Sequence, residues 1–119
     1  MKSFTSLEQS KKLAEILPLE SADMHYVLID TESELYSAGL GEYIGILPHY
    51  PCWSLAALLG ILPTIDDRNA EFCKDIRYDK WHVFYHSTAT LPLIDTERYH
   101  DIVDACYEMI LNLHELKML

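Results

Sequence analysis

Apolar residues near the C-terminal end of the chain recur with the spacing of an amphipathic α-helix. Over residues 96–117 they return every three or four positions: Tyr99, Ile102, Val103, Cys106, Met109, Ile110, Leu113 and Leu116. This spacing places them on one helical face, and Asp95 or Thr96 is suited to cap the first turn. We therefore predict a long C-terminal helix that packs this face against the core.

A helix is also predicted near the N-terminus, over residues 6–16. Thr5 and Glu8 have the spacing of a capping box, in which each side chain bonds to the backbone amide of the other residue. Pro18 is expected to end this helix, because the residue before a proline is pushed out of the helical conformation.

The middle of the chain contains a segment without any charged residue, between Pro51 and Pro63. Such a segment in an acidic protein is expected to be buried in the core. We predict a helix over residues 52–61, because Pro51 suits the first turn and Gly60 suits the end.

Strands are predicted where β-branched and aromatic residues gather or alternate with polar ones, at residues 25–29, 42–47, 72–78 and 81–86. Residues 30–34 are expected to form a polar loop. The order of elements predicts an α+β fold, with a small antiparallel sheet of three to four strands packed against about three helices. The length of 119 residues predicts a single globular domain over 1–119.

The charge balance narrows the classes of partner. The chain has 19 acidic and 9 basic residues, a formal net charge of −10. Phosphate backbones and anionic membranes repel such a chain, so we expect neither direct nucleic-acid binding nor membrane binding. Three cysteines with no close spacing argue against a disulfide framework, and the N-terminus lacks an apolar signal core. We expect a cytoplasmic protein.

No catalytic, nucleotide-binding or metal-binding motif is evident, so we expect no catalytic residue, metal or cofactor. Two groups keep an alternative open, a small enzyme or ligand-binding domain. Cys52 is predicted at a helix start, which would lower its thiol pKa, with His49 three residues away. Three acidic residues share one face of the predicted C-terminal helix: Asp101, Asp104 and Glu108. The ordinary interpretation of that face is a solvated surface.

Aromatic residues provide the candidate binding residues. Tyr and Trp are enriched in protein interfaces, and they are also ordinary residues of sheets and cores. The candidate anchors are Tyr43, Tyr50, Trp53 and Trp81.

Three motifs carry a resemblance that spans most of the chain. They lie at Ser6–Leu13, Pro51–Leu59 and Asp104–Ile110. With these motifs the chain resembles a family of small uncharacterised proteins of Bacteroides-type bacteria and their prophages or mobile elements. The resemblance implies a bacterial or phage cytoplasmic setting and no particular activity.

The preferred hypothesis is a small, acidic, non-catalytic protein-interaction domain, encoded by a phage or mobile element, whose partner is a host or phage protein. A third interpretation is an anionic mimic of nucleic acid, which would bind a basic DNA-binding protein in a salt-sensitive way. The oligomeric state is not specified by the sequence.

Overall fold

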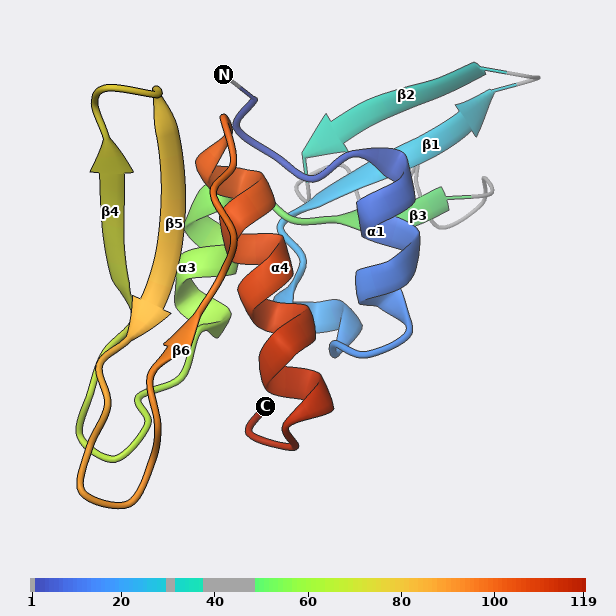
Figure 1. Ribbon diagram of the computed structural model, residues 1–119. Helices are drawn as coiled ribbons and strands as arrows, with labels where there is room; N and C mark the ends of the chain where they lie inside the picture. The colour runs from blue at the N-terminus through green and yellow to red at the C-terminus, as the bar shows by residue number, and fades with distance from the viewer. Residues whose placement is uncertain (1, 30–31, 38–48) are drawn as a thin grey trace. The chain divides into compact units, whose positions relative to one another are not determined.

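The computed structural model describes residues 2–29, 32–37 and 49–119, and these fall into two compact units (Figure 1). One unit is Ser3–Ala57 and the other is Lys2 with Leu58–Leu119. The first contains α1 (Leu7–Ala14), the short 3-10 helix η1 (Leu19–Ser21), β1 (Met24–Ile29), β2 (Glu32–Ser37) and β3 (His49–Cys52). Helix α3 (Leu55–Ile61) runs from this unit into the second, which contains β4 (Glu71–Asp75), β5 (Lys80–Tyr85), β6 (Ile94–Asp95) and α4 (Ile102–Glu115).

The Ser3–Ala57 unit is an antiparallel sheet of order β2-β1-β3 with α1 against β3. Tyr26 lies opposite Leu35 on one side and Tyr50 on the other. A further bridge joins Phe4 to Ser54 and brings the two ends of the unit together.

The capping box of α1 lies one residue later than predicted. Ser6 accepts a hydrogen bond from the Gln9 amide, and the Gln9 side chain accepts one from the Ser6 amide. The Thr5 hydroxyl is occupied elsewhere, because it lies 2.8 Å from the Ser10 hydroxyl and accepts a bond from the Trp53 amide. The capping box predicted at Thr5 and Glu8 was therefore wrong by one position, whereas the predicted helix is present.

Two assignments in the first unit were also wrong. The first three residues of β2 (32–34) lie in the predicted polar loop but form a strand, because β1 pairs with β2 from Ile29–Glu32 to Met24–Ser37. Residues 49–52 form strand β3, so the predicted helix starts at Leu55 instead of 52. Pro51 is tolerated there because β3 is an edge strand, where a missing amide donor costs little. The predicted strand at 42–47 lies outside the described residues.

The second unit is an antiparallel sheet of order β4-β5-β6 with α4 against β5 (Figure 1). The sheet contributes Val83, Tyr85 and Ile94 to its core. Six residues of α4 are buried: Val103, Ala105, Cys106, Met109, Ile110 and Leu113. The predicted apolar face is therefore confirmed at its centre, whereas Leu116 at its end is exposed.

Helix α4 begins later than predicted, because the residues before it pair with β5. The Thr96 amide donates to the Val83 carbonyl, and Tyr99 exchanges two backbone bonds with Trp81. Between the pairs Phe84–Asp95 and Trp81–Tyr99, β5 has two residues (82 and 83) and the facing segment has three (96 to 98). This extra residue makes a β-bulge. Asp101, rather than Asp95 or Thr96, occupies the N-cap of α4.

The predicted fold class is confirmed: the chain is α+β, with antiparallel strands and a long C-terminal helix. The described strands divide between two three-stranded sheets instead of forming one. A single domain over 1–119 stays a prediction. In the described ranges, no helix is long and apolar enough to cross a membrane.

Candidate functional site

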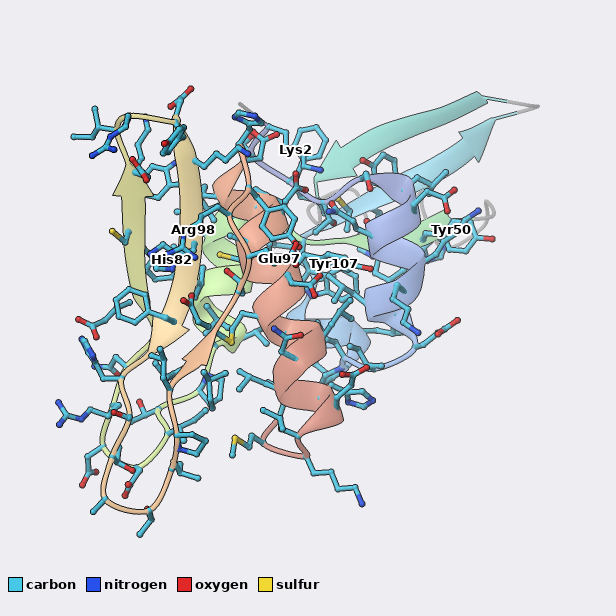
Figure 2. All side chains as sticks on the ribbon, viewed as in Figure 1. Lys2, Tyr50, His82, Glu97, Arg98 and Tyr107 are labelled. Carbon is cyan, nitrogen blue, oxygen red and sulfur yellow. The ribbon has the colours of Figure 1, made fainter. Side chains whose placement is uncertain are left out.

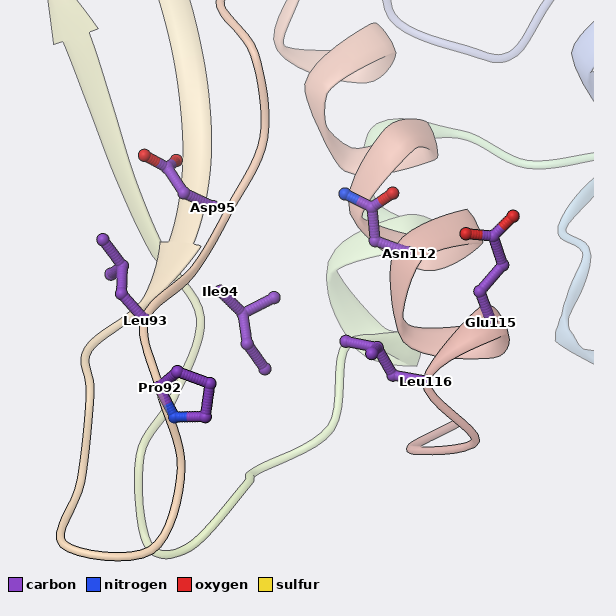
Figure 3. Close-up of a pocket in the computed structure, with 7 residues that line it drawn as sticks. All are labelled: Pro92, Leu93, Ile94, Asp95, Asn112, Glu115 and Leu116. Atoms are coloured by element: carbon purple, nitrogen blue, oxygen red, sulfur yellow. The ribbon is translucent and has the colours of Figure 1, made fainter.

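A groove lies between β6 and the C-terminal end of α4 (Figure 3). It has a volume of about 360 Å³ and is open to solvent. Seven residues line it: Pro92, Leu93, Ile94, Asp95, Asn112, Glu115 and Leu116. Both walls belong to the second unit, so the groove is built from the sheet and helix of one compact body.

The walls of the groove are largely apolar. Figure 3 shows the Ile94 and Leu116 side chains pointing toward one another from opposite walls. Ile94 is anchored in the core, whereas Leu116 is 52% exposed and Leu93 is 55% exposed. Two half-exposed leucines beside an open groove leave apolar surface in water that a partner could cover.

Two carboxylates border this apolar surface. Asp95 Oδ1 lies 2.7 Å from His82 Nδ1, and Asp95 Oδ2 lies 3.8 Å from an Arg98 nitrogen (Figure 2 labels both partners). Glu115 is exposed and forms no ion pair with any described residue. Asp95 is therefore already bound by His82 near Arg98, and Glu115 is the carboxylate beside the groove that has no ion-pair partner among the described residues.

Strand β6 presents unpaired backbone groups at this groove. The bond from the Thr96 amide to the Val83 carbonyl makes Phe84–Asp95 a non-hydrogen-bonded pair. The amide and carbonyl of Ile94 therefore point to β5, and those of Leu93 and Asp95 point away from it. Within the described residues, no backbone or side-chain group bonds to these outward groups. The groove thus runs beside a free sheet edge.

The predicted binding residues are not gathered at one place. Tyr43 lies outside the described residues. Tyr50 lies on β3 with the Lys11 ammonium 5.1 Å from its ring centre. Trp53 is fully buried, and its indole donates to the Ser21 hydroxyl at 3.0 Å, so it is a core residue of the first unit and not an exposed anchor.

Trp81 lies on β5 in the second unit. It is only partly exposed, and the Lys74 ammonium lies 5.6 Å from its ring centre. Its indole nitrogen is buried without a hydrogen-bond partner among the described residues. Its surroundings suit a packing role in the sheet, with Lys74 covering the ring.

The Cys52–His49 pair does not form a nucleophilic site. Cys52 is the last residue of β3 and is fully buried, with its sulfur 3.6 Å from the Thr5 hydroxyl. Burial raises the pKa of this thiol, the opposite of the shift expected at a helix start. Residues three apart on a strand also project from opposite faces, so His49 is directed away from Cys52.

The acidic residues at the start of α4 and at its N-cap bind neighbouring groups. The Lys2 backbone amide donates to Asp101 at 3.0 Å, and the Lys2 ammonium lies 2.6 Å from Asp104. Burial raises the pKa of Tyr99, and the nearby Glu108 carboxylate adds to this rise. No group of three or more metal-ligating side chains occurs in the part of the chain that the structure describes.

Two histidines share the outer face of β5 with Phe84. The His82 ring stacks on Phe84 at 5.1 Å, and the His86 ring meets Phe84 edge-on at 5.1 Å. Each binds its own carboxylate at 2.7 Å, His82 to Asp95 and His86 to Glu71. The structure therefore gives them separate acidic partners.

No family model matches the chain, and comparisons with curated proteins and with solved structures find no match. The groove itself was not predicted. Leu116 was assigned to the buried helix face and residues 87–93 to a loop, and the only signal for the site is the apolar Leu93 next to a proline.

Proposed function

We propose that this chain is a small, acidic, non-catalytic protein-interaction domain that binds a partner protein through the groove beside β6. The observation that carries the proposal is the combination of half-exposed Leu93 and Leu116 with an unpaired strand edge. Exposed apolar surface next to open backbone groups is energetically unfavourable in water, and a partner would relieve both costs.

The environments of the candidate catalytic and metal-binding residues support an interaction role. Cys52 is buried and projects away from His49, and Asp101 and Asp104 are bound by Lys2. The setting that we propose is the cytoplasm of a bacterium or its phage, in keeping with the three free thiols and the motifs described above.

The test is a pull-down from the lysate of a Bacteroides-type bacterium, with three forms of the tagged full-length chain. Wild type and Leu19→Ser are expected to capture the same stoichiometric partner at moderate salt, and Leu116→Ser is expected to lose it. Leu19 is the matched control because it is 62% exposed and lies in the other unit.

Capture that is unaffected by Leu116→Ser would contradict the proposed groove. Capture that disappears at moderate salt for every form would favour the nucleic-acid mimic, since such a complex depends on long-range charge. Melting temperatures of the variants show whether any loss reflects unfolding.

A further inference from the structure

We infer that the partner enters the groove as an extended peptide that adds a strand to the free edge of β6, with apolar residues alternating with lysine or arginine. This inference rests on the proposed function, because it specifies what the same groove binds.

The backbone of β6 has the groups that strand addition requires. Leu93 and Asp95 each direct an amide and a carbonyl away from β5, toward the groove. These residues are two positions apart, roughly 7 Å along the strand, which is the repeat at which an added strand would bond. Pro92 has no amide hydrogen, so the usable edge begins at Leu93. The site therefore suits a short extended segment.

Alternation along β6 determines which side chains such a peptide would need. Ile94 faces the helix side, where Leu116 points at it across the groove (Figure 3). Asp95 faces the other side, where it meets His82. Because an added strand alternates in the same way, its helix-facing residues would meet apolar surface and the residue beside Asp95 would favour a positive charge.

The charge of the groove selects against acidic peptides. Glu115 has no cationic partner among the described residues, and the whole chain carries −10. A lysine or arginine near Glu115 would gain attraction, whereas an acidic residue there would be repelled. The groove therefore favours a basic and apolar extended segment.

The experiment uses two fluorescein-labelled peptides of eight residues, one repeating Val-Lys and the other repeating Val-Glu. Fluorescence anisotropy measures their binding to the full-length chain. The Val-Lys peptide is expected to bind at least tenfold more tightly than the Val-Glu peptide. Glu115→Lys is expected to weaken Val-Lys binding about fivefold or more, the size of an exposed charge pair that is reversed. Glu20→Lys changes the net charge equally in the other unit and is expected to leave binding unchanged.

Leu93→Pro tests the backbone contact directly. It removes an amide that points to the groove and takes no part in the β5–β6 ladder, so folding should persist while Val-Lys binding falls about tenfold. Leu93→Ala keeps the amide and separates this effect from loss of the side chain, so its binding should fall less. Melting temperatures of both variants confirm folding.

The inference is overturned if Val-Glu binds as well as Val-Lys, if Val-Lys does not bind, or if Leu93→Pro binds like Leu93→Ala. If Leu116→Ser loses the lysate partner while Leu93→Pro retains it, the groove remains a binding site and only strand addition fails. A dimer in sedimentation that Leu93→Pro dissociates would assign the edge to a second copy of the chain and overturn the peptide occupant.

Discussion

His82 holds Asp95 across the β5–β6 ladder, with the imidazole Nδ1 2.7 Å from the carboxylate Oδ1. The two side chains are 13% and 28% exposed, so the contact is partly shielded from water. His82 thereby fixes the position of one of the two carboxylates at the groove.

A double-mutant cycle should detect this contact as an energetic coupling. His82→Gln, Asp95→Asn and the double variant are compared by urea denaturation. We expect a coupling of about 1 kcal/mol, typical for a charge-assisted hydrogen bond that is partly shielded. The pair His86–Glu71 is the control, because its side chains are about half exposed and its coupling should be smaller. Additive effects at His82 and Asp95 would contradict the prediction.

Cys73 should be the only cysteine that reacts in the folded protein. It is exposed, whereas Cys52 and Cys106 are buried. Burial raises the pKa of Cys106 to about 12 and also raises that of Cys52, so neither forms a thiolate readily. Iodoacetamide at neutral pH, followed by mass spectrometry, should show one adduct in native protein and further adducts in denaturant. Cys73→Ser should show none in the native state; rapid labelling of Cys52 would reverse our assignment of its environment.

Met109 and Ile102 should differ in their contribution to stability, although the sequence places both on one helical face. Met109 is fully buried, and Met109→Ala should cost about 2–5 kcal/mol in the free energy of unfolding. Ile102 is only partly buried at the start of α4, so Ile102→Ala should cost clearly less. Chemical denaturation of both variants gives the comparison, and equal losses would mean that α4 packs in a different rotation.

Tyr85 should make the protein sensitive to alkali. Burial raises the pKa of its phenol from 10.0 to about 12, and the hydroxyl donates to the Pro63 carbonyl at 2.7 Å. Since folding favours the neutral phenol, its contribution is complete below pH 10 and is lost as the pH rises from 10 to about 12. The urea midpoint of wild type should therefore fall more steeply above pH 10 than that of Tyr85→Phe. Parallel pH profiles would exclude this linkage.

The Thr5 hydroxyl should contribute to the stability of the first unit. Its buried hydroxyl lies 2.8 Å from the Ser10 hydroxyl and accepts a 3.2 Å bond from the Trp53 amide. Thr5→Val leaves those groups without this partner and should cost about 1–3 kcal/mol in the free energy of unfolding. Thr5→Ser keeps the hydroxyl and should cost less. Thr64→Val removes an exposed bond to Asn69 and serves as the control with little loss.

The sequence was most informative where a long repeat determines structure. The spacing from Val103 to Leu113 predicts α4 correctly, because a helix of several turns repeats its apolar signal many times. The start of α4 was missed, because Thr96 and Tyr99 are recruited by the backbone of β5, a long-range contact without a local signal.

Short elements depended on partners that local patterns do not reveal. Strand β2 has an acidic sequence and exists because β1 pairs with it. Pro51 is compatible both with the first turn of a helix and with an edge strand. Only its pairing with His25 distinguishes the two. The groove needs residues 92–95 and 112–116 to meet, so periodicity alone could not indicate that Leu116 stays in water.

The Phe4–Ser54 bridge ties the N-terminal segment to the start of α3. The Leu55 amide, at the first residue of α3, donates to the Ser3 carbonyl at 2.9 Å beside this bridge. Fraying of the N-terminal segment would therefore also remove a backbone partner from the first turn of α3.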